Sequence, residues 1–268
     1  MLESIRRSAI ATVGIVAMFS ATVCRADSSD WAFTVGEKSW VTQWTTWYPA
    51  ASVTPLTSSN GIRVIETQNS ATELAEIPQV SARYRDWIAS ASYMTNTNYS
   101  LTGVVDPTSG TSSPQGGTRK EIDASAGYYF FPSLAATVGY KRIDQDFGAG
   151  YSYSWSGPTV GLTGSGAIAP HLSLYGAFAY GYLTLDAAKV ASDSLGRTSF
   201  HADYYVGEFG LAYLFNPFKR LTLSALLGYR AQVVMTRNFA LSTGFGSYTY
   251  TDVHDNTEGP ALSLLARF

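Results

Sequence analysis

Apolar side chains alternate with small or polar ones along most of the chain after Trp31, and this period of two is the feature that most restricts the fold. Between Leu221 and Val233, one face carries only Leu, Ala, Tyr and Val, whereas the other carries Thr, Ser, Leu, Gly, Arg and Gln. The stretches 122–130 and 205–213 alternate in the same way. Successive side chains of a strand point to opposite faces, so the pattern predicts β-strands that each have one apolar face. No stretch longer than about a dozen residues keeps the spacing of an amphipathic helix.

Ten strands are predicted, with boundaries near 31–47, 73–86, 87–103, 118–130, 133–147, 151–164, 171–186, 199–214, 220–236 and 258–268. The connections between them alternate strictly between two kinds. Short ones centre on Asp86, Pro132, Pro170 and Pro217, and polar, mostly long ones occupy 48–72, 104–117, 187–198 and 237–257, with a shorter one near 148–150. An antiparallel sheet of this kind has tight turns at one end and loops at the other. Eight or twelve strands are the alternatives, because Gly157 and Pro158 interrupt one of the runs.

The chain has few charges for its length. Only 14% of its 268 residues are charged, while 46% are hydrophobic and 14% are aromatic. An ordinary soluble domain has about 25% charged residues. Disordered chains are rich in charge and poor in aromatic residues, so this composition excludes disorder. It also argues against nucleic-acid binding, because a formal net charge of -2 provides no surplus of Lys and Arg to bind phosphates.

Residues 1–26 have the pattern of a secretory signal peptide. Arg6 and Arg7 precede an apolar run from Ala9 to Phe19, and small residues then lead to Ala26, the predicted cleavage site. The run is too short to span a bilayer as a helix, which takes about 20 residues. A retained amphipathic helix and a lipoprotein modified at Cys24 are the alternatives. Cleavage leaves 27–268 as a single domain without its only cysteine, and so without disulfides or thiolate metal sites.

The chain ends in a strand pattern that closes on an aromatic residue. Leu262, Leu264, Ala266 and Phe268 share one face of this last strand. Together with the export signal and the alternating strands, this ending resembles the closing strand of bacterial outer-membrane β-barrel proteins. The resemblance implies an all-β, closed antiparallel up-and-down transmembrane β-barrel with both termini in the periplasm. It also implies that Phe268 serves as an assembly signal, through which the barrel-assembly machinery recognises the last strand. Bacterial barrels use an even number of strands, which agrees with ten.

Physical chemistry also favours a membrane around such a sheet. A soluble monomer does not expose so much contiguous apolar area, whereas lipid accommodates it once the sheet closes and leaves no unpaired edge. Tyr and Trp residues fall near strand ends, as expected of the aromatic girdles at the two membrane interfaces. Outer-membrane lipid and lipopolysaccharide are therefore the expected partners. A soluble two-sheet sandwich or lipocalin-like barrel is the alternative architecture.

Charged residues on the opposite faces are predicted to form a network in the lumen. They are Arg83, Arg85, Glu121, Asp123, Lys141, Glu208, Arg230 and Arg267. Unpaired buried charges are costly, so the presence of both signs favours ion pairs that fill the interior. A barrel of about ten strands is close to the size that side chains can fill. We expect a filled barrel with long extracellular loops and a structural or surface-interaction role. The alternative is a narrow, porin-like passive channel with these charges as its filter.

An outer-membrane hydrolase is the second alternative. Ten-stranded outer-membrane proteases use acidic and His side chains at the outer rim. Asp252, His254 and Asp255 in the predicted last loop are similar to part of such a site, as are Glu121 and Asp123. A carboxylate beside a histidine can activate water. The sequence His171-Leu172-Ser173 resembles the His-x-Ser of lipid A deacylases, yet it falls beside a short turn, at the end opposite the outer leaflet.

No catalytic, cofactor or metal site is predicted, and the chain is not expected to be an enzyme. The three histidines, His171, His201 and His254, fall on different elements. Neither a phosphate-binding glycine loop nor a Gly-x-Ser-x-Gly elbow occurs. Acidic residues in or beside the loops are candidates for weak binding of divalent cations near lipopolysaccharide; these are Asp186, Asp193, Asp252 and Asp255. Solvated loop positions are the simpler interpretation of all of them.

Overall fold

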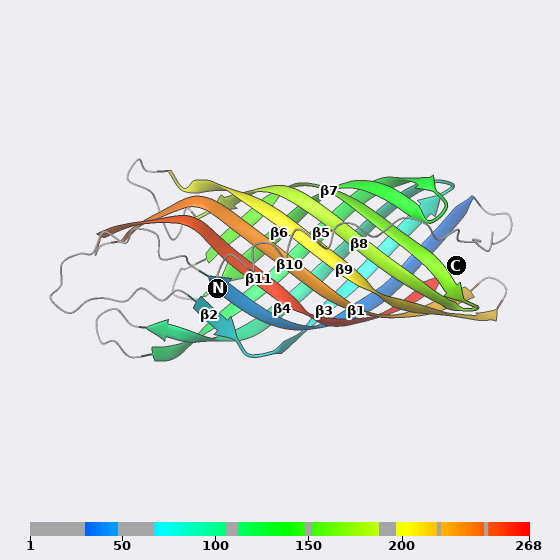
Figure 1. The fold of residues 1–268 in the computed structure, drawn as a ribbon, viewed down its shortest axis with the longest axis horizontal. Coiled ribbons are helices and arrows are strands. Elements are labelled where there is room, and N and C mark those ends of the chain that lie inside the picture. Colours follow the sequence, from blue (N-terminus) through cyan, green and yellow to red (C-terminus); the bar gives the residue numbers. More distant parts are fainter. Residues whose placement is uncertain are drawn as a thin grey trace.

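In the computed structural model, the chain forms one closed antiparallel β-barrel (Figure 1). The structure describes residues 30–47, 67–105, 112–147, 152–187, 197–218, 221–243 and 246–268. The strands are β1 (Trp31–Trp47), β2 (Thr67–Ser70), β3 (Glu73–Tyr84), β4 (Trp87–Val105), β5 (Ser112–Phe131), β6 (Leu134–Asp146), β7 (Ser152–Ala169), β8 (Leu172–Asp186), β9 (Ser199–Phe218), β10 (Leu221–Thr243) and β11 (Gly246–Arg267). Within these ranges, no helix is long and apolar enough to cross a membrane.

The barrel closes because β11 pairs with both β10 and β1. The short β2 shares one position of the ring with β3, since β1 pairs with β3 over residues 31–42 and with β2 over residues 45–47. Both β2 and β3 also pair with β4. The eleven strands therefore fill ten positions of the ring. The predicted closed, up-and-down antiparallel barrel of ten strands is confirmed.

The strands are steeply tilted against the long axis of the barrel (Figure 1). A path through paired residues leaves β1 at Thr34 and returns to β1 at Thr46, an offset of 46 − 34 = 12 residues. Between these ends it passes through Ser81, Ser90, Ser125, Gly139, Thr159, Gly181, Tyr204, Val234 and Asp255. With about 3.3 Å per residue and about 4.8 Å between strands, this offset corresponds to a tilt of about 40°.

Short turns gather at one end of the barrel, which we call the turn end; it carries Arg85, Pro132, His171 and Phe218. Arg85 and His171 have φ values of 53° and 66°, the left-handed conformation that tight turns use. β11 ends there too, and the backbones of Phe268 and Phe33 exchange two hydrogen bonds of 3.0 and 3.1 Å. The opposite end, which we call the loop end, carries the strand ends Trp47, Val105, Asp146, Asp186 and Thr243.

All ten predicted strand regions form strands, but several strands are longer than expected. The prediction of a long loop at 237–257 is wrong, because β10 and β11 stay paired from Arg237 and Asp252 up to Thr243 and Gly246. The predicted loop 104–117 likewise contains the beginning of β5. The beginning of β5, 112–117, contains only Ser, Pro, Gln and Gly, so the alternation that reveals strands is absent there. β7 runs through Gly157 and Pro158 without a break in its pairing with β6.

Exposed apolar side chains form a band around the outside of the barrel, as predicted from the alternation. Its middle includes Val80, Val138, Leu162, Phe178, Phe209, Leu227 and Leu264. Exposed aromatic residues border the band on both sides. A lower row toward the turn end includes Trp31, Trp87, Tyr128, Phe215 and Phe268, and an upper row includes Tyr93, Tyr140, Tyr182 and Tyr229. Beyond the upper row, outward positions become polar, as at Arg142, Asp144 and Asp186.

Inside the barrel, large side chains concentrate in the half nearer the loop end. One buried apolar cluster contains Trp40, Trp44, Met94, Tyr99 and Leu101 with smaller neighbours. A second contains Ile143, Trp155, Leu183, Phe200, Tyr204 and Val234. The half nearer the turn end is lined mostly by small residues, such as Ser90 and Ser125, whose hydroxyl groups are 2.8 Å apart. The predicted export signal, 1–26, lies outside the described residues.

Candidate functional site

Eight charged side chains meet in the lumen beside the two apolar clusters. Four are basic, Lys38, Arg119, Lys141 and Arg230, and four are acidic, Glu121, Asp123, Glu208 and Asp255. They come from β1, β5, β6, β9, β10 and β11, which places them on strands from all sides of the ring. Each lies on the inward face of its strand, so the alternation that turns apolar residues outward also turns these charges inward. The formal charges of this lumen network cancel.

Glu121 forms the first centre of the lumen network. Its carboxylate accepts hydrogen bonds from Arg119 Nε at 2.8 Å and from Gln232 Nε2 at 2.5 Å. Lys141 Nζ lies 2.8 Å from its other oxygen. The Glu121 side chain is only 4% exposed. Removing a carboxylate from water is costly, and three donors with two positive charges compensate that cost.

Asp255 forms the second centre of the network. It accepts hydrogen bonds from Arg119 Nη1 at 2.5 Å, from Trp44 Nε1 at 2.7 Å and from Gln145 Nε2 at 3.0 Å. The guanidinium of Arg119 therefore bridges Asp255 and Glu121, and its side chain is fully buried. It also lies over the ring of Trp44, 5.8 Å from the centroid. A single arginine thus ties β5 to β11 across the lumen.

Glu208 forms the third centre, nearer the turn end. Lys38 Nζ lies 2.5 Å and Arg230 Nη1 3.2 Å from its Oε2 atom, and the hydroxyl of Tyr175 donates to Oε1 at 3.2 Å. Arg230 also lies over the ring of Trp40 at 5.1 Å. Tyr175 reaches this position because Gly228 has no side chain. A Cβ atom there would come within 2.3 Å of the Tyr175 hydroxyl and 2.5 Å of the Phe209 carbonyl oxygen.

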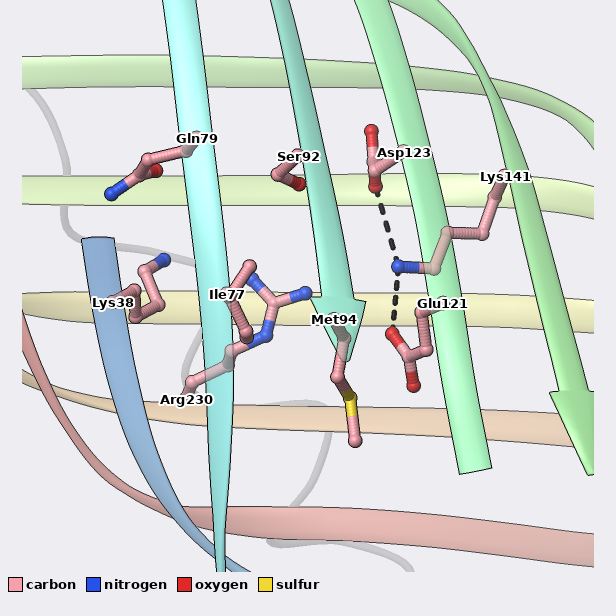
Figure 2. A pocket seen from close by; sticks show the side chains of 9 residues that line it. All are labelled: Lys38, Ile77, Gln79, Ser92, Met94, Glu121, Asp123, Lys141 and Arg230. Carbon is pink, nitrogen blue, oxygen red and sulfur yellow. Dashed lines mark hydrogen bonds and ion pairs between the residues drawn. The ribbon is translucent and has the colours of Figure 1, made fainter. Parts of the chain in front are cut away.

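A small cavity lies beside Glu121, lined also by Asp123 and by the basic residues Lys38, Lys141 and Arg230, and Figure 2 shows the side chains that line it. Lys141 reaches between the two carboxylates of β5, 2.8 Å from Glu121 and 3.4 Å from Asp123, and the methionine Met94 closes part of the wall. The cavity has a volume of about 30 Å³, enough for about one or two water molecules. At this level side chains and paired charges fill the lumen.

Five of the predicted lumen residues meet in the network: Glu121, Asp123, Lys141, Glu208 and Arg230. Arg83 and Arg267 lie apart from it, near the turn end. The guanidinium of Arg83 stacks on Tyr129 at 4.2 Å, and its Nε donates to the carbonyl oxygen of Arg85 at 2.7 Å. Arg267 is the last residue of β11, paired with Thr34 and Thr222.

The prediction that Arg85 points into the lumen is wrong. Arg85 lies in the turn between β3 and β4, its side chain is 63% exposed, and its Nη2 donates to Asp30 at 3.1 Å. The strand alternation that assigned it to the inward face stops at Tyr84, because a turn residue in the left-handed conformation no longer follows the pleat.

Three members of the network were not predicted: Lys38, Arg119 and Asp255. Lys38 and Arg119 each carried a usable signal, since Lys38 shares a face with Gly36 and Trp40, and Arg119 shares one with Glu121 and Asp123. Asp255 was assigned to a loop and carried no such signal. It is instead a residue of β11 with Val253 and Thr257 on the same buried face.

Among the candidate protease residues, the structure separates His254 from Asp255. Asp255 lies inside the barrel, whereas His254, the next residue toward the amino terminus, faces the outside of the same strand. Glu121 and Asp123 are held in the lumen network. The placement of Asp252 and Asp255 in a loop is wrong, because both belong to β11. The oxygens of Asp255 are taken up by protein donors, which contradicts its role as a loop ligand for cations.

The remaining candidate residues are dispersed. His171 is exposed in the turn before β8, and His201 of β9 stacks on Tyr182 with ring centroids 3.9 Å apart. Asp186 ends β8, and Asp193 lies outside the described residues. Among the described residues, no group of three or more His, Cys, Asp and Glu side chains is arranged to hold a metal ion.

No protein-family model and no curated protein matches the sequence. Among solved structures, the outer-membrane protease OmpT from Escherichia coli is similar over 91% of this chain and 100% of its own, with 10% identity and a TM-score of 0.47. The translocator domain of the autotransporter NalP from Neisseria meningitidis covers 91% of this chain and 90% of its own, with 14% identity and a TM-score of 0.41. The toluene transporter TodX of Pseudomonas putida covers 90% and 91%, with 10% identity and a TM-score of 0.27. These neighbours are bacterial outer-membrane β-barrel proteins with different activities, and the likeness concerns architecture alone.

Proposed function

We propose that the protein is an integral β-barrel of a Gram-negative outer membrane, closed to solutes by its lumen network, with a structural or surface-interaction role and no enzymatic activity. The observation that carries this proposal is the fully buried Arg119, held between Glu121 and Asp255 in the interior. In this proposal the turn end and both termini face the periplasm, and the loop end faces outward.

The outer surface supports the membrane placement. Large apolar side chains such as Val138, Phe209 and Leu227 are more than 60% exposed, and each would be unfavourable in water. Lipid removes this cost, and an aromatic row on either side of the band corresponds to the girdles of transmembrane barrels. Outer-membrane lipid and lipopolysaccharide are thus the proposed partners of this surface.

The lumen network supports closure. Ions could pass the level of Arg119 only if its two carboxylate partners separated from it. Removing one partner of a buried ion pair costs about 3–5 kcal/mol, and a separated state of similar cost is about 10²–10⁴ times rarer than the paired one. The lumen has no net charge at this level, so no single ion sign is attracted into it.

Single-channel recording of the purified, refolded protein in planar bilayers tests the proposal. We expect no current steps at voltages at which a porin reconstituted in parallel conducts ions. Reproducible ion-selective openings would contradict closure and favour the narrow passive channel. Insertion is checked separately on unboiled detergent gels, where a folded barrel migrates differently from its boiled form. A protein that shows no such shift and fractionates as soluble would contradict the membrane placement.

A further inference from the structure

One acidic side chain of the described strands lies within the apolar band on the outside of the barrel. Glu37 of β1 is exposed, and the outward residues that precede it on the strand are Trp31, Phe33 and Val35. Its register partners are Pro78 of β3 and Leu264 of β11. An ionisable residue that faces lipid is expensive, so Glu37 requires an explanation.

The tilt of the strands fixes the height of Glu37. A path that follows paired residues once around the ring ends twelve residues closer to the loop end than it began. A path that stays at constant height must therefore step back toward the turn end by about one residue at each of the ten positions. At the height of Glu37 this path meets Val80, Ala91, Ala126, Val138, Leu162, Phe178, Phe209, Leu227 and Leu264. All nine are apolar and exposed. Glu37 therefore lies well inside the band.

Glu37 belongs to a small polar patch. Glu76 of β3 lies on the same outward face, two residues along its strand from Pro78, the register partner of Glu37, and Glu76 Oε2 accepts a hydrogen bond from Ser39 Oγ at 3.1 Å. A carboxylate that faces lipid is costly, so the neutral, protonated carboxyl group is the favoured form of Glu37. We call Glu37, Ser39 and Glu76 the carboxyl patch. It is a protonated, hydrogen-bonding surface on the outside of the barrel.

The upper aromatic row is interrupted at the carboxyl patch. Tyr229 of β10 and Tyr93 of β4 are exposed on either side of it. On the three strand positions between them, the outward residues at this height are Leu262 of β11, Ser39 of β1 and Pro78 of β3. Aromatic side chains mark where a barrel meets lipid headgroups. A contact with another protein replaces lipid headgroups at this level, so it needs no aromatic residues there and uses hydrogen-bonding groups instead. The interrupted row and the carboxyl patch together meet this description.

We propose that the carboxyl patch is the contact between two copies of this chain, which lie side by side in the membrane around a two-fold axis along the membrane normal. The inference rests on the membrane placement proposed above. Such an axis keeps both copies at one height, so each patch meets its own counterpart. A protonated carboxyl group and a hydroxyl group both donate and accept hydrogen bonds, so the patch is self-complementary, as a two-fold contact requires. Val35, Val41 and Leu264 surround it with apolar area.

Disulfide cross-linking in intact membranes tests this contact, in a Cys24→Ser background. Val35→Cys is the test variant, because Val35 is 42% exposed and two residues from Glu37 on the same face. Leu162→Cys is the control, because Leu162 is 49% exposed at the height of Glu37 but five positions away in the ring of ten. We expect Val35→Cys to give an oxidised band at twice the monomer mass and Leu162→Cys to stay monomeric.

Two further variants test the chemistry of the contact in the Val35→Cys chain. Replacing Glu37 and Glu76 by Leu removes the hydrogen bonds and should abolish the dimer band, whereas replacing both by Gln keeps donors and acceptors and should retain it. Equal cross-linking of Val35→Cys and Leu162→Cys would overturn the proposal. So would a monomeric Val35→Cys protein or a cross-linked band of another mass, which would indicate a different partner. If neither cysteine variant shows the gel shift of a folded barrel, the membrane placement itself fails, and this contact with it.

Discussion

Arg119 and Asp255 are 136 positions apart in sequence, yet Nη1 of the arginine lies 2.5 Å from Oδ1 of the aspartate in the middle of the barrel. The same guanidinium holds Glu121 at 2.8 Å. All three side chains are nearly or fully buried. The arginine is therefore the common partner of two carboxylates that would otherwise repel each other.

Replacement of Arg119 by Met should destabilise the barrel by about 3–5 kcal/mol, because two buried carboxylates lose their shared cation. Urea unfolding of the refolded protein in detergent or lipid measures this loss. The control is Arg142→Met, since Arg142 pairs with Asp144 on the outside and its side chain is 52% exposed; exposed pairs are worth less than about 1 kcal/mol. Equal losses in the two variants would contradict the role assigned to the buried arginine.

Gly228→Ala should destabilise the barrel by about 1–3 kcal/mol, as overpacking of a filled interior does. The added methyl group meets the Tyr175 hydroxyl at 2.3 Å and a backbone oxygen at 2.5 Å, and the second contact cannot be relieved by a rotamer change. Gly207→Ala is the matched control, because a Cβ atom at Gly207 has no neighbour within 4 Å. The urea midpoints of the two variants give the comparison, and a Gly228→Ala protein as stable as the Gly207→Ala protein would show that the lumen is not tightly packed there.

Phe268→Ala should lower the amount of folded protein in the outer membrane several-fold if the last strand is the assembly signal. Its side chain is 56% exposed at the turn end, so little packing is lost with it. Phe215→Ala serves as control, because Phe215 is 50% exposed near the same end but lies on β9. Membrane fractions probed on unboiled gels report the yield. An equal effect of both substitutions would assign the loss to the aromatic row instead of to the end of the chain.

The purified barrel should cleave no peptide, and His254→Ala should change nothing in such an assay. The physical reason is the placement of His254 and Asp255 on opposite faces of β11, which leaves this histidine without that carboxylate as an orienting partner. Incubation with a mixture of unstructured peptides, followed by mass spectrometry, checks it. Cleavage that disappears in the His254→Ala variant would favour the hydrolase alternative.

The sequence predicts the barrel well wherever one face of a strand meets lipid. In β10, the alternation from Leu223 to Tyr229 assigns the strand and its outward face correctly. Beyond Thr236 the alternation is confined to two short stretches, 239–242 and 248–251, with Gly244 and Gly246 between them, and this was too little to predict the extension of β10 and β11. Turn geometry also limits the prediction of inward-facing residues. The left-handed backbone of Arg85 ends the alternation, and the spacing of apolar residues does not indicate where this happens.

The charges of the lumen network were only partly predictable for a different reason. Alternation tells which residues point inward, and it found Glu121, Lys141 and Glu208. It says nothing about which inward residues lie at one height, since this depends on the offset of twelve residues around the ring. The pairing of Arg119 with Asp255 and of Lys38 with Glu208 follows only once that offset is known.

The closure of the ring by β1 and β11 determines when the fold can be completed. β1 pairs along one edge with the nearby β3, but its other edge pairs with residues 246–267, which are synthesised after all the other strands of the ring. Until then the chain carries two open, apolar sheet edges, which are prone to pair with other chains. Closure of the barrel therefore requires β11, and a chain truncated before Gly246 is expected to aggregate instead of forming a smaller barrel.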